Sequence, residues 1–93
     1  MPLDYATYFA KVKTLILCSL DGDNYDIDSL RETLKGDTDL LDDVRIDSLY
    51  FLEFFMRLED EFQIKIEEEN YSKLTSINKI IQYLQENDFT ILK

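Results

Sequence analysis

The spacing of apolar residues predicts a helix at each end of the chain. From Asp4 to Leu20, apolar side chains recur at steps of three and four residues, which is the period of one helix face. That face consists of Tyr5, Phe9, Val12, Ile16 and Leu20. The last helix has the same spacing and begins behind a capping Thr75 or Ser76. Its apolar positions are Ile77, Ile80, Ile81 and Leu84.

The central helix is predicted from Asp47 to Phe62 and has two apolar faces. It contains no Gly or Pro and opens on an Asp-Ser pair suited to helix capping. On a helical wheel of about 100° per residue its bulky side chains gather in one direction, which we name the core face. The core face consists of Phe51, Phe54, Phe55, Leu58 and Phe62. A second patch, the exposed trio, lies to one side and consists of Leu49, Leu52 and Met56.

The exposed trio is more apolar surface than a small bundle needs for folding. It is bordered by carboxylates, and Ser48 lies beside it at the start of the helix. An apolar strip with a charged rim is typical of a docking surface. We therefore expect partners to bind Leu49, Leu52, Glu53, Met56, Glu59 and Asp60.

The connections contain shorter elements. After an acidic turn, Asp28 or Ser29 is expected to cap a short helix that runs through Lys35 and stops at Gly36. The long loop that follows is expected to be held to the core by Leu40, Leu41 and Val44. Beyond the central helix, we expect an extended connection that buries Ile64 and Ile66, then one helical turn within Glu67–Leu74 with Tyr71 and Leu74 directed inward.

These elements predict an all-α fold, a small three-to-four-helix bundle with a long first loop. We expect residues 1–93 to form one domain. For the tail, residues 88–93, both packing on the bundle and flexibility stay open.

Composition narrows the function classes. The chain has 93 residues and a formal net charge of -10, so it repels phosphate backbones and anionic lipids. We expect a monomer with basic protein partners and with no affinity for nucleic acid or membranes. The chain has no histidine, which removes the commonest general base and leaves no Ser-His or Cys-His pair. We therefore expect no enzymatic activity and no catalytic residues.

Location and metal binding are further expectations. The single cysteine, Cys18, cannot form an internal disulfide, and the chain shows neither a signal peptide nor a run of about 20 apolar residues. The expected compartment is the cytoplasm. An acidic run beginning at Asp21 invites comparison with a calcium loop, but Asp26 stands where the sharp turn requires Gly. A solvated acidic loop without metal is the better interpretation.

The tetrapeptide Ile-Asp-Ser-Leu occurs at Ile27 to Leu30 and again at Ile46 to Leu49. Capping accounts fully for Ser29, which opens a helix of less than two turns. Capping would also be a sufficient reason for Ser48, but it does not explain the exposed trio that follows.

The second copy, with its surroundings, resembles the recognition helix of acyl carrier proteins. The resemblance rests on Asp47-Ser48-Leu49, then Glu53, then the run from Met56 to Phe62. It extends from about Leu40 through the final helix, with Thr75-Ser76-Ile77 at the usual start of that helix. It implies that Ser48, flanked by Asp47 and Leu49, carries a covalent 4'-phosphopantetheine arm derived from coenzyme A.

The resemblance also implies partners and cargo. A phosphopantetheinyl transferase would attach the arm, and acyl-loading and acyl-processing enzymes with basic docking patches would use the acyl thioester that it holds. A cavity for the acyl chain beside the central helix is implied as well, and the Phe residues could line it or fill it. An aminoacyl or peptidyl cargo is the second possibility, and an unmodified acidic interaction module is a rival from another class.

Three positions depart from the family pattern. Arg45 stands where Gly is usual, Tyr50 replaces a frequent acidic residue, and no Pro follows Ile66. Arg45 and Tyr50 flank the attachment site, so the departures bear on which transferase and which enzymes accept this chain. The hypothesis that follows is a specialised, free-standing carrier for a dedicated pathway of fatty-acid-like, polyketide or other acyl biosynthesis.

Overall fold

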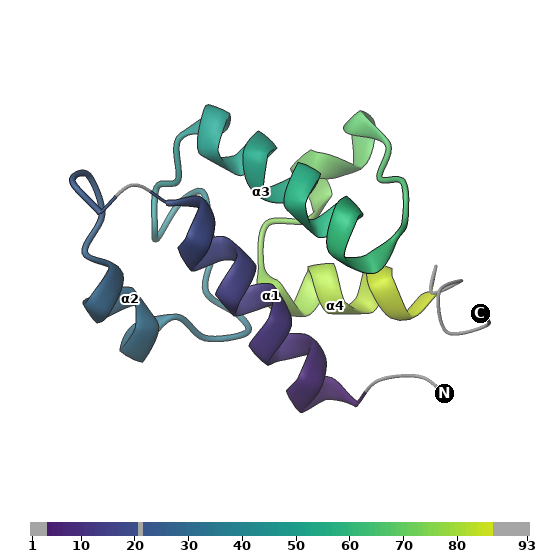
Figure 1. Cartoon of the computed structure of the whole chain (residues 1–93), viewed down its shortest axis with the longest axis horizontal. Coiled ribbons are helices and arrows are strands. Elements are labelled where there is room, and N and C mark those ends of the chain that lie inside the picture. The colour runs from purple at the N-terminus through teal and green to yellow at the C-terminus, as the bar shows by residue number, and fades with distance from the viewer. Residues whose placement is uncertain (1–3, 21, 87–93) are drawn as a thin grey trace.

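The computed structural model describes residues 4–20 and 22–86, and within them every regular element is a helix (Figure 1). In chain order they are α1 Tyr5–Ser19, α2 Ile27–Thr33, α3 Ser48–Phe62, the 3-10 helix η1 Glu68–Lys73 and α4 Ile77–Glu86. The predicted all-α bundle with a long first loop is confirmed. The long loop lies between α2 and α3. The tail from Phe89 to Lys93, like residue 88, lies outside the described residues.

Helix α1 packs against α3, α4 and α2 (Figure 1). It buries Tyr8, Val12 and Ile16, which follow one another at intervals of four residues. The predicted face was therefore wrong at its first positions, because Tyr5 is 49% exposed and Phe9 is only half-buried. Tyr5 instead donates a hydrogen bond from its hydroxyl to the side chain of Asn78 at the start of α4.

Helix α2 begins and ends earlier than predicted. Its cap is Asp26, whose side chain accepts a hydrogen bond from the Ser29 N–H at 3.0 Å, so neither Asp28 nor Ser29 caps it. The helix ends at Thr33 rather than Lys35. Gly36 therefore does not terminate it. A Cβ at Gly36 would collide with the Asn78 side chain, and the Gly36 carbonyl accepts from the Asn78 N–H at 2.9 Å. Gly36 is needed for the close approach of the first loop to α4.

The first loop is anchored through Leu40, which is fully buried. The Leu40 N–H donates to the Thr75 carbonyl at 2.7 Å, and the Leu40 carbonyl accepts from the Ile46 N–H at 3.0 Å. These two bonds connect the segment before α4 to the segment before α3. Val44 is partly buried as predicted, whereas Leu41 is 37% exposed and does not anchor the loop.

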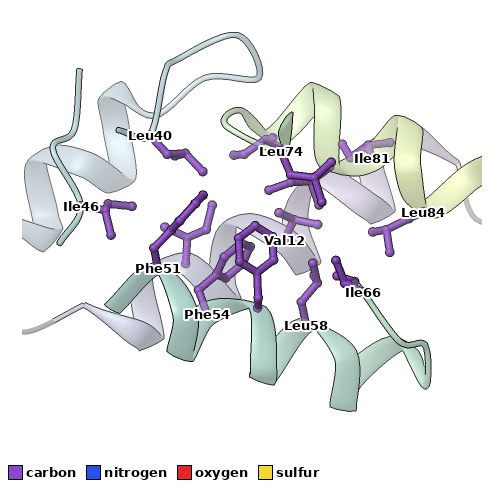
Figure 2. Close-up of a cluster of buried hydrophobic side chains, with 14 of the residues drawn as sticks. Val12, Leu40, Ile46, Phe51, Phe54, Leu58, Ile66, Leu74, Ile81 and Leu84 are labelled. Atoms are coloured by element: carbon purple, nitrogen blue, oxygen red, sulfur yellow. The ribbon is translucent and has the colours of Figure 1, made fainter. Parts of the chain in front are cut away.

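The core face of α3 is buried as predicted (Figure 2). Figure 2 shows Phe51, Phe54 and Leu58 directed from α3 into a cluster of apolar side chains from the other elements. The Phe55 ring stacks on Tyr71 with centroids 4.4 Å apart, and it also contacts Phe51 and Phe54 at 4.6 and 5.2 Å. The rings of Phe51, Phe54, Phe55 and Tyr71 therefore pack directly against one another beside α3.

The second half of the chain closes the core over α3. Gln63 ends α3 in the left-handed conformation, with φ 55°. Ile66 and Leu74 are buried as predicted, whereas Ile64 and Tyr71 are half-buried. Ser76 caps α4 by accepting a hydrogen bond from the Lys79 N–H at 3.3 Å. All four predicted apolar positions of α4 are buried: Ile77, Ile80, Ile81 and Leu84.

Substitutions at the neighbouring residues Phe55 and Met56 test the division of α3 into a buried core face and an exposed trio. Phe55→Ala removes a fully buried ring, and the loss of its packing together with the resulting cavity should lower the free energy of unfolding by about 3–5 kcal/mol. Met56→Ala removes a side chain that is 62% exposed, and the expected change is within about 0.5 kcal/mol. Urea denaturation followed by circular dichroism measures both. Equal losses in the two variants would contradict the assignment of the faces.

Candidate functional site

Ser48 is the first residue of α3, and its side chain is exposed. The cap of the helix is Asp47, whose Oδ1 accepts a hydrogen bond from the Leu49 N–H at 2.9 Å. No hydrogen bond of the Ser48 hydroxyl occurs within the described part of the chain. Capping, which the sequence offered as a sufficient reason for Ser48, belongs to Asp47 instead. The Ser48 side chain is therefore exposed and is not the helix cap.

The two copies of Ile-Asp-Ser-Leu enter their helices in different registers. In the first copy Ile27 opens α2, so Ser29 is already the third residue of the helix. In the second copy Ile46 precedes the cap and is 6% exposed, which places Ser48 at the first position. Ile46 and Phe51 occupy the two positions of a hydrophobic staple, and both belong to the buried core. Burial of Ile46 therefore fixes the register that presents Ser48.

The turn before Ser48 is held by Tyr25, which the sequence did not single out. Arg45 has φ 60°, a left-handed conformation that costs a residue with a side chain about 1–2 kcal/mol. This conformation gives a physical reason for the Gly that is usual at this position. The Asp47 N–H donates to the Tyr25 hydroxyl at 2.9 Å, and that hydroxyl lies 3.5 Å from the Arg45 carbonyl oxygen. Only the fold brings Tyr25, some twenty residues earlier, to this turn.

The exposed trio lies on the surface as predicted. Leu49, Leu52 and Met56 are 61%, 39% and 62% exposed. The side chains of Glu53 and Asp60 are also exposed beside them. These residues surround one face of α3 that starts at Ser48 and faces away from the core.

Glu59 has a structural task in addition to its place on the rim. Its Oε2 accepts a hydrogen bond from the Ile66 N–H at 2.6 Å, which ties the end of α3 to the connection that follows. The residue is half-buried. Glu59 also lines an open hollow of about 660 Å³, whose other lining residues are Met56, Asp60, Gln63, Ile64 and Lys65. Replacing Glu59 would therefore disturb the backbone as well as the surface charge.

Carboxylates outnumber basic groups along α3 and the segment that follows it, so this part of the bundle is negatively charged. Burial raises the pKa of the Tyr71 hydroxyl, and the carboxylates of Glu59, Glu68 and Glu67 raise it further because they oppose a second negative charge. From Ile46 to Asn70 the sequence has eight acidic residues against Arg57 and Lys65, an excess of six negative charges. This excess of negative charge would attract a basic surface.

The described residues contain neither a cluster of metal ligands nor a membrane-spanning helix. Within residues 4–20 and 22–86, no three His, Cys, Asp or Glu side chains converge in a way that could hold a metal ion. Asp21, the first residue of the acidic run, lies outside the described residues. None of the described helices has the length and apolar character required to span a membrane.

Comparison with known proteins identifies the family. A family model described as the phosphopantetheine attachment site matches residues 26–84, which contain the whole of α3 and its surroundings. The acyl carrier protein of Lactobacillus acidophilus is 29% identical over 77 residues, which cover 83% of this chain and 88% of the relative.

The acyl carrier protein of Buchnera aphidicola subsp. Acyrthosiphon pisum is 34% identical over 62 residues, which cover 67% of this chain and 78% of the relative. The resemblance seen in the sequence is confirmed. The chain belongs to the acyl carrier protein family, whose members are carriers with a covalently attached 4'-phosphopantetheine group.

Proposed function

We propose that Ser48 is the attachment residue and that the loaded chain presents acyl groups to partner enzymes. The observation that carries the proposal is the hydroxyl of Ser48, which is exposed at the start of α3 while Asp47 satisfies the helix cap. The residues fit the group because the serine has no structural bond to lose when it is modified. Ser29, the serine of the first copy, lies inside the first turn of α2 instead.

The surroundings of Ser48 suit a phosphodiester. The unpaired N–H groups and the dipole at the start of a helix favour negative charge by about 0.3–1 kcal/mol at an exposed position. When bound, the prosthetic group supplies a terminal thiol that holds the acyl cargo as a thioester. The chain itself holds Ser48 in place and offers a docking surface, and without histidine it has no ordinary base for catalysis. Its proposed role is that of a carrier and not an enzyme.

The exposed trio and its rim are the proposed docking surface for a phosphopantetheinyl transferase and for acyl-loading and acyl-processing enzymes. The apolar centre of Leu49, Leu52 and Met56 gives a small area to bury, and Glu53, Glu59 and Asp60 attract basic residues. Charge attraction of this kind speeds association, while a small contact area permits release. A carrier that visits several enzymes in turn needs both properties.

Arg45 and Tyr50, which flank Ser48 in place of the usual residues, support a specialised pathway rather than bulk fatty-acid synthesis. The proposed location is the cytoplasm. An aminoacyl or peptidyl cargo is the alternative within the same mechanism. Exchange of the loaded protein with general fatty-acid synthesis enzymes would contradict the specialised role.

The assignment of Ser48 as the attachment residue can be tested with Ser29, the serine of the other Ile-Asp-Ser-Leu copy, as the control. Wild-type protein incubated with coenzyme A and a broad-specificity phosphopantetheinyl transferase should gain one arm, measured by intact-protein mass spectrometry. Ser48→Ala should gain none because the nucleophilic oxygen is gone. Ser29→Ala removes the serine of the other Ile-Asp-Ser-Leu copy and should be modified to the same extent as wild type. Modification that persists in Ser48→Ala, or no modification of wild type by any transferase, would favour another serine or an unmodified interaction module.

The docking surface can be tested by comparing two pairs of charge reversals that change the net charge equally. Glu53→Lys combined with Asp60→Lys should raise the KM of the transferase for the carrier roughly tenfold at low salt, because electrostatic steering is lost. Glu32→Lys combined with Asp37→Lys makes the same change in net charge at exposed positions of α2 and the first loop.

The control pair should leave KM within about twofold of wild type, and the difference between the pairs should shrink as salt shortens the Debye length to about 8 Å at physiological ionic strength. If both pairs raised KM equally, net charge rather than the α3 rim would account for the binding.

A further inference from the structure

We propose that Tyr25 is a positioning residue for the modification of Ser48. It lies in the connection between α1 and α2, and it contacts the chain on both sides of Ser48. The inference rests on Ser48 being the attachment residue, and it names the part of the carrier that fixes this serine for the transferase.

The hydroxyl of Tyr25 holds the segment before Ser48. It accepts the Asp47 N–H at 2.9 Å, and it lies within a longer 3.5 Å of the Arg45 carbonyl oxygen, to which it donates. One hydroxyl proton and one oxygen lone pair therefore serve two backbone groups of the same turn. The Asp47 N–H precedes the helix, so no carbonyl of α3 can accept it.

The ring of Tyr25 holds the segment after Ser48. It meets the ring of Tyr50 edge to face, with centroids 5.8 Å apart. Tyr50 is the third residue of α3, within the first helical turn. Tyr25 is partly buried against the core on its inner side. A single side chain that packs on the core thus contacts residues 45, 47 and 50, while Ser48 between them has no side-chain hydrogen bond to the described part of the chain.

The conformation of the turn makes such a contact necessary. Arg45 adopts φ 60°, where a residue with a side chain is disfavoured, so the turn needs an outside group to hold it. Ile46 supplies one anchor through its N–H bond to the Leu40 carbonyl. Tyr25 supplies the other anchor nearer to Ser48. Without it the turn samples other conformations, and only a fraction of the molecules presents Ser48 in the geometry that the transferase binds.

The test is Tyr25→Phe, which keeps the ring and removes only the hydroxyl. If a hydrogen bond of ordinary strength selects the competent turn, its loss should raise the KM of the transferase for the carrier about fivefold. The kcat should stay close to wild type, because binding to the transferase restores the turn. Hydrogen exchange of the Asp47 amide, followed by NMR, should accelerate by about the same factor.

Tyr5→Phe is the matched control. It also removes a tyrosine hydroxyl that bonds across the fold, in this case to Asn78, at the other end of α1 from the Tyr25 connection. It should lower thermal stability to a similar degree and leave the KM unchanged. The same change in KM for both variants would show that general loosening is responsible, and it would overturn a positioning role for Tyr25.

The remaining outcomes are equally decisive. Faster exchange at Asp47 with an unchanged KM would mean that the hydrogen bond exists but does not position Ser48, and the proposal would fail. An unchanged exchange rate would overturn the hydrogen bond itself. In either case Ser48→Ala still reports separately on the attachment residue, so failure of the Tyr25 proposal is distinguishable from failure of the proposed function. Circular dichroism on each variant confirms that the helices are retained.

Discussion

The start of α3 is the point on which this fold and its proposed function both depend. A chain of contacts fixes it, from the Thr75 carbonyl to Leu40, from Leu40 to Ile46, and from buried Ile46 to the Asp47 cap. Because Ile46 is held in the core, α3 can begin only where Ser48 is its first residue. The same register turns the Phe residues inward and leaves the exposed trio outside. One set of anchors therefore determines the packing of α3 and the placement of the proposed docking surface and attachment residue.

The spacing of apolar residues correctly predicted the buried faces of α3 and α4. The core face of α3 and the four apolar positions of α4 follow from spacing alone, because bulky side chains on one stripe must be buried. Spacing failed only at the first positions of α1, where the fold buries Tyr8 instead of Tyr5, whereas Val12, Ile16 and Leu20 are buried as predicted. The sequence also missed the cap of α2, which is Asp26 rather than Asp28 or Ser29, and it did not decide between Asp47 and Ser48 as the cap of α3. Tertiary contacts such as the burial of Ile46 decide which candidate residue caps the helix.

Some features of the candidate site could likewise be predicted from the sequence, and others could not. The exposed trio and its rim were predictable because surplus apolar residues on a short helix stand out. The backbone role of Glu59 and the contact of Tyr25 with the Asp47 turn were not, because both depend on segments that are distant in sequence or irregular in structure. Arg45 gave a partial signal. A residue where the family has Gly suggests a left-handed turn, and such a turn needs an external hold.

The most direct measurement is to locate the prosthetic group by peptide mass spectrometry after enzymatic modification. Trypsin cuts after Arg31, Arg45 and Arg57, so Ser48 is the single serine of the peptide from Ile46 to Arg57, and Ser29 falls in a different peptide. The account predicts one 4'-phosphopantetheine group on the peptide that contains Ser48 and none on the peptide that contains Ser29. An arm found on the Ser29 peptide, with the Ser48 peptide unmodified, would contradict it.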